Sequence, residues 1–296
     1  MSTDYLLRPM TQRDVPEVEG VRAEAFADLQ RRTHRPGRPE SAAVTDAAST
    51  QWRERVAHLL AGDPRGCWVA EDRVGILGAA VSMKRDLTWL LAEHVVRPGV
   101  QGRGVGRQLL DAALGHGSGC LRAMVSVTDD PSAGRRYRLA GLTLHPTMLL
   151  GGLVPREALP VLERVRDGSA GDIDLLNSVD RQVRDSAHGR DHDLLFRSYR
   201  LVVTDRVVGS GYAYVAPGGG PHLLAATSRR AAAEVLWESL AASSPETPVT
   251  VRGVTAENEW ALDVALACRL SLSTSGYLAL RGMKPPTPYL HSAYFL

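Results

Sequence analysis

The sequence contains little lysine and cysteine and no long hydrophobic run. Lys84 and Lys284 are its only lysines, a bias that the codon usage of a GC-rich genome explains as well as any arginine-specific role. The three cysteines (Cys67, Cys120 and Cys268) are isolated, which argues against a disulfide framework or a zinc site and favours a reducing compartment. No apolar run reaches the roughly 18 residues of a membrane span. We therefore expect neither a membrane protein nor a disulfide-rich secreted one.

The charges nearly cancel, with 35 Lys and Arg against 33 Asp and Glu. Such a balance gives no general attraction to nucleic acid or to an acidic membrane surface. The N-terminus has neither the cationic start nor the apolar core of a secretory signal. The 44% hydrophobic content excludes a disordered chain, and 296 residues correspond to two domains at roughly 100–200 residues each. We expect a cytoplasmic, two-domain protein that binds neither nucleic acid nor membranes.

The first half of the chain alternates between strand and helix patterns, which predicts an α/β fold. Val15, Val18 and Val21 recur at helical spacing after Thr11, whereas 30–43 is polar and contains two prolines, as a loop would. We expect strands over residues 5–8, 67–70, 74–83, 87–96 and 121–127, and helices after Thr11, around 52–60, through 109–113 and over 131–139.

Three short patterns of the first half recur in the same order in the second. The matched segments are Arg8-x-x-Thr11-x-x-Asp14 with Arg166-x-x-Ser169-x-x-Asp172, Asp72-Arg73-Val74 with Asp205-Arg206-Val207, and Asp130-x-x-Ala133 with Asn258-x-x-Ala261. Repeated order favours a duplicated fold over coincidence. The boundary then falls in 151–162, which carries Gly-Gly and two prolines.

A glycine-rich loop between a predicted strand and a predicted helix points to an anion site. Residues 91–110 read LAEHVVRPGVQGRGVGRQLL. Free amides at a helix start and the positive end of its dipole attract a phosphate. We expect Gly104 and Gly106 to let such a group approach the backbone. The segment lacks the Gly-Lys-Ser/Thr of a P-loop and the acidic residue of a dinucleotide-binding βαβ unit.

Two linked motifs give the sequence a specific resemblance. The first is Val96-x-Pro98-x-x-Gln101-x-x-Gly104-x-Gly106, and the second is Asp130-x-x-Ala133-x-x-x-Tyr137-x-x-x-Gly141-Leu142. Together they resemble the GNAT superfamily of acetyl-CoA-dependent N-acetyltransferases. The family's Asn and Phe are replaced by Asp130 and Leu142. The resemblance is strong over about residues 5–150 and weak over 160–282.

The resemblance implies two tandem GNAT-like domains, each with a mostly antiparallel twisted sheet flanked by helices. We expect a catalytic first copy over residues 1–150, a linker over 151–162, and a degenerate second copy over 163–282. Residues 283–296 form a tail rich in proline and aromatic residues, which we expect to be ordered and packed on the protein, near the acceptor cleft.

The resemblance also implies a role for each motif residue. Asp130 stands where the family has a cofactor-binding Asn, and Tyr137 where it has the general acid that protonates the departing thiolate. The backbone of Val95 and Val96 would pair with the pantetheine arm like an added strand. The CoA diphosphate would bind the loop and the helix start, formed by Gln101, Gly102, Arg103, Gly104, Val105, Gly106 and Arg107.

The base that deprotonates the amine is expected on the strand before the loop. Glu93 and His94 are the candidates, directly or through water, and only one can face the substrate because strand side chains alternate. A bulge, usual in this family, leaves open which one. We favour Glu93, although a carboxylate or imidazole with only a structural hydrogen bond is an equal alternative.

The remaining histidines and a basic cluster are interpreted as surface features. His188 and His192 lie four apart in a polar context that favours a solvated loop, and we predict no metal site. Four arginines fall between the first two helices, where this fold has its acceptor rim, and a charged surface loop is the simpler interpretation. They are Arg31, Arg32, Arg35 and Arg38.

Two functions from different classes fit these residues. The leading one is acetyl transfer from acetyl-CoA to a primary amine in a ternary complex. The other is a CoA-binding sensor or interaction protein without turnover. Small-molecule and peptide amines, a longer acyl group and a homodimer all stay open. The second copy has no Gly-x-Gly at 227–231 and carries Ala265 where the first has Tyr137, so we expect one CoA per chain.

Overall fold

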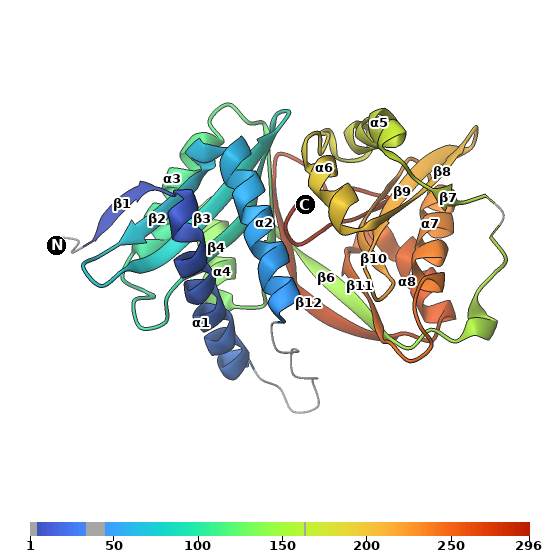
Figure 1. The fold of residues 1–296 in the computed structure, drawn as a ribbon, viewed down its shortest axis with the longest axis horizontal. Helices are drawn as coiled ribbons and strands as arrows, with labels where there is room; N and C mark the ends of the chain where they lie inside the picture. The colour runs from blue at the N-terminus through green and yellow to red at the C-terminus, as the bar shows by residue number, and fades with distance from the viewer. Residues whose placement is uncertain (1–4, 34–44, 163) are drawn as a thin grey trace. The chain divides into compact units, whose positions relative to one another are not determined.

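The computed structural model describes residues 5–33, 45–162 and 164–296 (Figure 1). The strands are β1 (Leu6–Pro9), β2 (Cys67–Glu71), β3 (Ile76–Arg85), β4 (Thr88–Val96), β5 (Arg122–Val127), β6 (Thr143–Gly152), β7 (Arg166–Asp167), β8 (Arg200–Arg206), β9 (Gly209–Val215), β10 (Pro221–Ala226), β11 (Val249–Val254), β12 (Ser271–Arg281) and β13 (Tyr289–Leu290). The helices are α1 (Val15–Thr33), α2 (Asp46–Gly62), α3 (Val105–His116), α4 (Pro131–Leu139), α5 (Ile173–Arg184), α6 (Asp191–Ser198), α7 (Arg229–Ala241) and α8 (Glu259–Ala267). Short 3-10 turns cover Gln12–Asp14, Pro64–Gly66, Arg156–Ala158, Ala170–Asp172 and Ala256–Asn258.

The chain divides into two compact units. The first unit comprises Met1–Val125 with Asp129–Arg136, and the second comprises Ser126–Thr128 with Tyr137–Leu296. The division falls before the expected linker at 151–162, because β6 forms its strand pairs with β11 and β12. We keep as a proposal the assignment of residues 1–150 and 163–282 to two copies of one fold, because it depends on the repeated sequence patterns.

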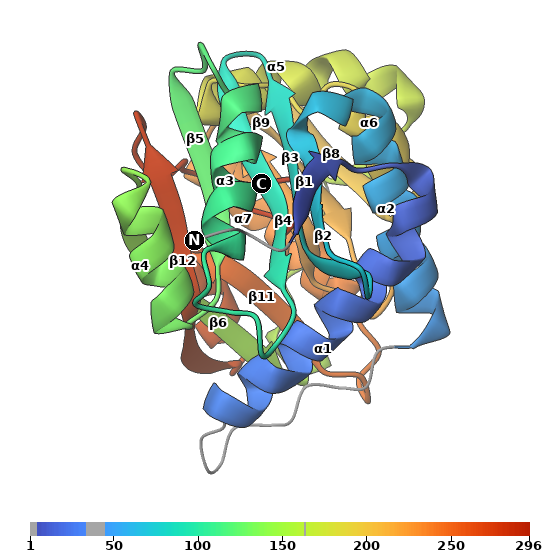
Figure 2. The ribbon, with the colours of Figure 1, turned by 90° about the vertical axis from the view of Figure 1, so that its left-hand side faces the viewer.

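The first unit is built on strands β1 to β5 in sequence order. Adjacent strands in this unit pair antiparallel, except that β4 and β5 pair parallel. Helix α3 packs on one face of the β3–β4 region, and α1 and α2 pack on the other (Figures 1 and 2). Val15, Val18 and Val21 are buried as their spacing predicted. The sheet is therefore covered on both faces, and β4 lies between the helix layers.

Helix α1 continues beyond the point where the sequence predicted a loop. It ends at Thr33, so the expectation of a loop from Gln30 was wrong for residues 30–33. Asp28 accepts hydrogen bonds from Arg31 and Arg32, and such i,i+3 and i,i+4 pairs stabilise a helix end. Residues 34–43, and with them Arg35 and Arg38, lie outside the described part of the chain.

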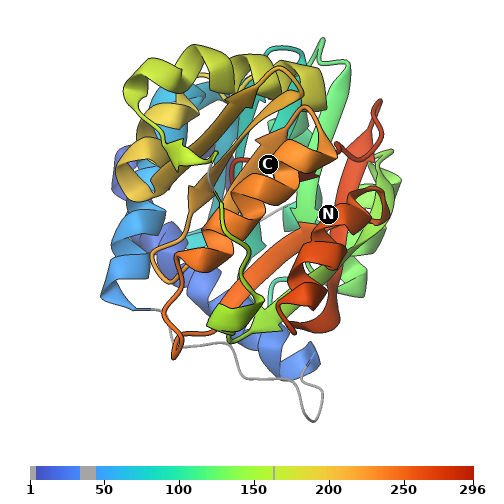
Figure 3. The ribbon, with the colours of Figure 1, turned by 90° about the vertical axis from the view of Figure 1, so that its right-hand side faces the viewer.

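The second unit contains two groups of strands. One is the antiparallel sheet β13-β10-β9-β8-β7, and the other places β6 between β12 and β11. Helix α7 packs on one face of the β8–β10 region (Figure 3), while α5 packs on the opposite face. A single core joins apolar residues of β10, α7, β11 and α8. No helix in the described ranges has the length and apolar character needed to cross a membrane.

The first repeated pattern has the same geometry in both places. Arg8 donates two hydrogen bonds to the Asp14 carboxylate, which also accepts from the amide of Thr11. Arg166 donates likewise to Asp172, and Asp172 accepts from the amide of Ser169. In each case the carboxylate closes a capping box at the first turn of a helix. The sequence match thus corresponds to the same hydrogen-bond arrangement in two places.

Candidate functional site

Strand β4 has an open edge over its second half. It pairs with β3 throughout, but its parallel pairing with β5 ends at Leu91, opposite Val125. The pairing with β3 shifts register between Leu91 and Glu93, so Ala92 forms the expected bulge. Within the described residues of the first unit, no strand pairs with the β5-side edge of 92–96. This edge can pair with an extended ligand.

Backbone direction separates the two valines that were expected to pair with a ligand. The amide of Arg97 donates to Leu77 O on β3, and backbone groups of alternate strand residues point to the same edge. The backbone groups of Val95 therefore point toward β3, which corrects the expectation for this residue. Those of Val96 point to the open edge, where Val96 O accepts a hydrogen bond from Gln101 Nε2.

The loop after β4 leads to a helix start without a side-chain cap. Gly99, Gly102 and Gly104 have φ angles of 86°, 79° and 94°, a region that favours glycine. Gly104 is the N-cap of α3 and, having no side chain, makes no capping hydrogen bond. The amides that follow it have no acceptor within the helix. A Cβ on Gly104 would meet no atom within 4 Å, so a ligand can approach these amides closely.

Gly106 has a different role from the one predicted. A Cβ there would lie 3.2 Å from Val96 Cγ2 and 3.5 Å from His94 Nε2. The missing side chain thus allows α3 to pack against β4, while the Gly106 amide remains one of the amides without an acceptor in the first turn. The expected side chains of the loop are otherwise placed for an anion: Gln101, Arg103 and Arg107 are exposed, and Arg107 pairs with Asp111 at 3.5 Å.

Glu93 and His94 point to opposite faces of β4. Glu93 is only 7% exposed, and its Oε2 accepts from Trp52 Nε1 at 2.9 Å and from Arg22 Nε at 3.2 Å. The Arg22 guanidinium also lies over the Phe26 ring, 4.9 Å from its centroid. Helices α1 and α2 thus orient the carboxylate. The sequence offered no signal for Arg22 or Trp52 as partners, because both lie far from Glu93 along the chain.

His94 packs beneath the start of α3. Its Nε2 donates to Gly106 O at 2.9 Å, since a carbonyl oxygen can only accept. Burial lowers the pKa of His94 to about 4, and the nearby charge of Arg136 acts in the same direction. The imidazole is therefore neutral at physiological pH. Burial therefore makes it a weaker base than an exposed histidine.

Asp130 and Tyr137 lie at the start and in the second turn of α4. Asp130 caps the helix, accepting from the amide of Ser132 at 2.8 Å, and pairs with Arg32 at 3.5 Å. Tyr137 is 5% exposed, and its carbonyl accepts from the amide of Leu142 beyond Gly141. Asp130 belongs to the first unit and Tyr137 to the second, so α4 spans the division.

The corresponding helix start in the second copy has its own cap. Helix α7 begins after only two residues beyond β10, and the Ser228 hydroxyl accepts from the amide of Ala231 at 3.2 Å. Thr227 next to it exchanges hydrogen bonds with Ser210. A side chain of the protein therefore occupies the place that an anion would take at an uncapped start.

The C-terminal tail covers the edge of β10. Leu224 and Ala225 pair with Leu290 and Tyr289 of β13, and the amide of Ala226 donates to Pro288 O. Tail packing is therefore confirmed, but the tail lies in the second unit against β10. Nothing in the local composition of 283–296 indicated which strand it would join.

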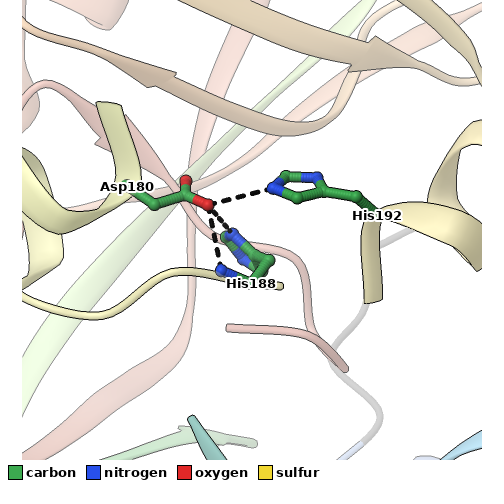
Figure 4. Close-up of side chains that lie close together, drawn as sticks. All are labelled: Asp180, His188 and His192. Carbon is green, nitrogen blue, oxygen red and sulfur yellow. Dashed lines mark hydrogen bonds and ion pairs between the residues drawn. The ribbon is translucent and has the colours of Figure 1, made fainter. Parts of the chain in front are cut away.

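Two histidines that the sequence assigned to a solvated loop are completely buried. His188 and His192 both contact Asp180, and none of the three has exposed surface (Figure 4). Burial and the charge of Arg184 lower the pKa of His188 to about 4. The interpretation of both histidines as solvated was wrong, because they pack with Asp180 in a buried cluster. The absence of a metal site stays a prediction, although the donor atoms of these three side chains lie close together.

Comparison with known proteins assigns part of the chain to a family. Residues 63–141, which include β4, the glycine loop, α3 and α4, match the acetyltransferase (GNAT) domain. The chain carries a GNAT acetyltransferase domain. None of the curated proteins matches the sequence.

Solved structures extend the GNAT fold over the whole chain. A candidate acetyltransferase from Pyrococcus horikoshii is similar over 100% of this chain and 96% of its own, at 16% identity and a TM-score of 0.74. A GCN5-related N-acetyltransferase from Sphaerobacter thermophilus is similar over 95% and 96%, at 14% identity and 0.59. A tandem GNAT protein from the clavulanic acid biosynthesis pathway is similar over 95% and 99%, at 13% identity and 0.54. The predicted α/β GNAT fold is thus confirmed.

Proposed function

We propose that this chain is an acetyl-CoA-dependent N-acetyltransferase that transfers the acetyl group directly to a primary amine. The observation that carries the proposal is the uncapped start of α3 beside the open edge of β4. It combines free amides, a positive helix end and an unpaired strand edge, which suit a diphosphate followed by an amide-containing arm. Acetyl-CoA, when bound, supplies an activated acetyl carbon and a thiolate leaving group.

The proposed roles follow the observed geometry. The amides of Val105, Gly106 and Arg107 bind the diphosphate, and Val96 orients the pantetheine arm at the strand edge. Arg103 and Arg107 add positive charge near the phosphates, since both are exposed beside the loop. In the proposal, Asp130 contributes through its cap of α4 and does not contact the cofactor.

Proton transfer is assigned to two residues. Tyr137 Oη donates a proton to the departing sulfur, the role that its place in the motif implies. Glu93 takes the proton from the acceptor ammonium, directly or through water, because Arg22 and Trp52 hold its carboxylate in a fixed orientation. His94 is the weaker candidate, since its Nε2 is committed to the hydrogen bond with Gly106 O beneath α3.

The second copy is proposed to bind no CoA. Asn258, at the position of the family's Asn, donates from Nδ2 to Pro286 O and accepts at Oδ1 from the amide of Tyr289. The tail backbone thus makes the amide contacts along β10 that a pantetheine arm would need. With Ser228 capping α7, neither part of a CoA site is open. Calorimetric titration should give one site per chain, and two sites would refute this assignment.

Replacement of Tyr137 by phenylalanine tests the catalytic proposal. We expect kcat for thiol release in the presence of a reactive amine to fall by roughly 10²–10⁴-fold, with CoA affinity unchanged, because only a proton donor is lost. Tyr277→Phe is the matched control and should keep wild-type kcat. If no amine in a panel of small-molecule and peptide acceptors accelerates thiol release by the wild-type protein, the chain is a CoA-binding protein without turnover.

A further inference from the structure

Asp180, His188 and His192 bring three donor atoms together in the interior of the second unit. Asp180 lies on α5, His188 in the following loop and His192 in the first turn of α6. Asp180 Oδ2 lies 2.7 Å from His188 Nδ1 and 3.2 Å from His192 Nε2, and all three atoms lie within 4.8 Å of one another. Figure 4 shows a nitrogen of each ring directed at the same carboxylate oxygen of Asp180.

This donor set matches the preferences of zinc. Two imidazole nitrogens and a carboxylate oxygen are common zinc ligands, with bonds of about 2.0–2.2 Å. Tetrahedral ligands at that distance lie about 3.3–3.5 Å from one another. The 3.2 Å separation of His192 and Asp180 is close to this value. The 2.7 Å separation from His188 requires the carboxylate to move by about 0.6 Å.

Three tyrosines complete the surroundings of the cluster. His192 Nδ1 lies 3.0 Å from Tyr214 Oη, and His188 Nε2 lies 3.3 Å from Tyr289 Oη. An oxygen beside the remote nitrogen of each ring is the arrangement that orients metal-binding histidines. Tyr212 Oη bonds to Asp180 Oδ1 at 2.5 Å and lies 3.4 Å from His188 Nδ1. It therefore places an oxygen beside the three donor atoms as a candidate fourth ligand.

The buried charges around the cluster favour a cation. Asp180 and Asp191 are both 0% exposed, whereas Arg184 is the buried guanidinium on the same segment. Arg184 donates from Nε to Ser186 O and from Nη1 to Leu296 O. These three residues thus place two carboxyl groups and one guanidinium in the interior. Burying net charge is costly, and a bound cation would offset it.

We propose that Asp180 Oδ2, His188 Nδ1 and His192 Nε2 bind one zinc ion, with the Tyr212 hydroxyl as the fourth ligand. The ion would connect α5, the loop that follows it, α6 and β9. Its role is structural, because no donor atom of the cluster is exposed. The proposal does not depend on acetyl transfer, and its test uses readouts other than activity.

Metal content and metal-dependent stability of the full chain test the proposal. We expect about one equivalent of zinc per chain after purification, a lower melting temperature after removal with a chelator, and recovery with Zn²⁺ but not with Mg²⁺. Cobalt substitution should give the visible absorption of four-coordinate Co²⁺. A protein that is free of metal, and whose melting temperature is unchanged by Zn²⁺ or chelator, would show that the cluster is only a hydrogen-bond network.

Variants separate metal binding from folding. His192→Gln should lose the bound zinc and its melting temperature should no longer respond to Zn²⁺. His58→Gln, on α2 of the first unit, is the control and should retain both. Tyr214→Phe is the milder variant if His192→Gln fails to fold. It removes only the hydroxyl beside His192 Nδ1 and should weaken zinc affinity by roughly 10–100-fold. Zinc affinity unchanged in Tyr214→Phe together with zinc retained in His192→Gln would overturn the assignment.

Discussion

Helices α3 and α7 follow corresponding strands in the two copies but begin differently. Before α3 the chain makes a long glycine loop, and Gly104 leaves the first amides without a side-chain partner. Before α7 the connection is two residues long, and Ser228 caps the helix. A helix with its own cap is more stable, whereas an uncapped one can bind an anion. The comparison shows how one fold can serve either stability or ligand binding at the same place.

Asp130 and Asn258 extend the comparison to α4 and α8. Asp130 accepts from the amide of Ser132 at its own helix start and pairs with the exposed Arg32. Asn258 is buried and connects its helix to the tail at Pro286 and Tyr289. The residue that keeps the family's identity therefore has a structural partner, while its counterpart near the proposed cofactor site has changed.

The largest expected effect is a loss of CoA affinity when the uncapped start of α3 is blocked. Gly104→Glu should weaken CoA binding by several kcal/mol, or at least about 100-fold, because it places a negative charge at the diphosphate site. Arg229→Glu, at the exposed start of α7, should leave the affinity unchanged. Gly104→Asn, which tolerates the left-handed backbone without added charge, separates strain from repulsion. Calorimetry with CoA measures all three, and wild-type affinity in Gly104→Glu would refute the loop assignment.

A second prediction exchanges the residue types at the starts of α4 and α8, where Asp130 and Asn258 hold corresponding positions in the sequence patterns. Asn258→Asp should reduce the free energy of unfolding by about 1–3 kcal/mol, because a carboxylate oxygen would then face Pro286 O inside the protein. Asp130→Asn should change it by less than about 0.5 kcal/mol, since Asn caps a helix as well as Asp does. Urea unfolding of both variants provides the measurement. Equal losses would mean that the tail contact does not distinguish the two positions.

The smallest expected effect concerns the Arg8–Asp14 and Arg166–Asp172 ion pairs at the two capping boxes. The Arg166 guanidinium lowers the pKa of Asp172 to about 2, and Arg8 lowers the pKa of Asp14. A carboxylate with a lowered pKa stabilises the fold above its unfolded pKa of about 3.9, and this stabilisation disappears as the pH falls through the folded value.

Asp14→Asn and Asp172→Asn should therefore each lower the free energy of unfolding by about 1 kcal/mol at neutral pH. This value is kept small because solvent screens the partly exposed arginines. The difference from wild type should shrink as the pH falls from about 4 toward 2. Thermal or urea unfolding at several pH values would show it. A difference that is constant with pH would contradict the ion-pair explanation.

Local features of the sequence were sufficient for much of the site. Helical spacing placed Trp52 and Leu60 in the core, and the strand ending at Val96 and the helix over 131–139 were predicted with their observed ends. These signals are local because a strand or helix has a fixed period along the chain. The glycine loop was found in the same way, since positive φ at Gly104 requires a residue type that is visible in the sequence.

Orientation and long-range partners could not be obtained in this way. Glu93 and His94 are neighbours, and only the bulge at Ala92 and the helices packed on β4 decide which face each takes. The reason for Gly106 is likewise a contact between α3 and β4. His188 was expected to be solvated because its surroundings along the chain are polar, whereas packing buries it completely.

The sequence by itself determined the mixed α/β pattern, the glycine loop and the repeated Arg-Asp motif, because each depends on residues within a few positions of one another. The tertiary structure alone decided that the tail joins β10, that Glu93 faces Arg22, and that His188 and His192 meet Asp180. These contacts join residues brought together only by packing, where burial makes polar groups find partners. Composition along the chain carries no record of such partners.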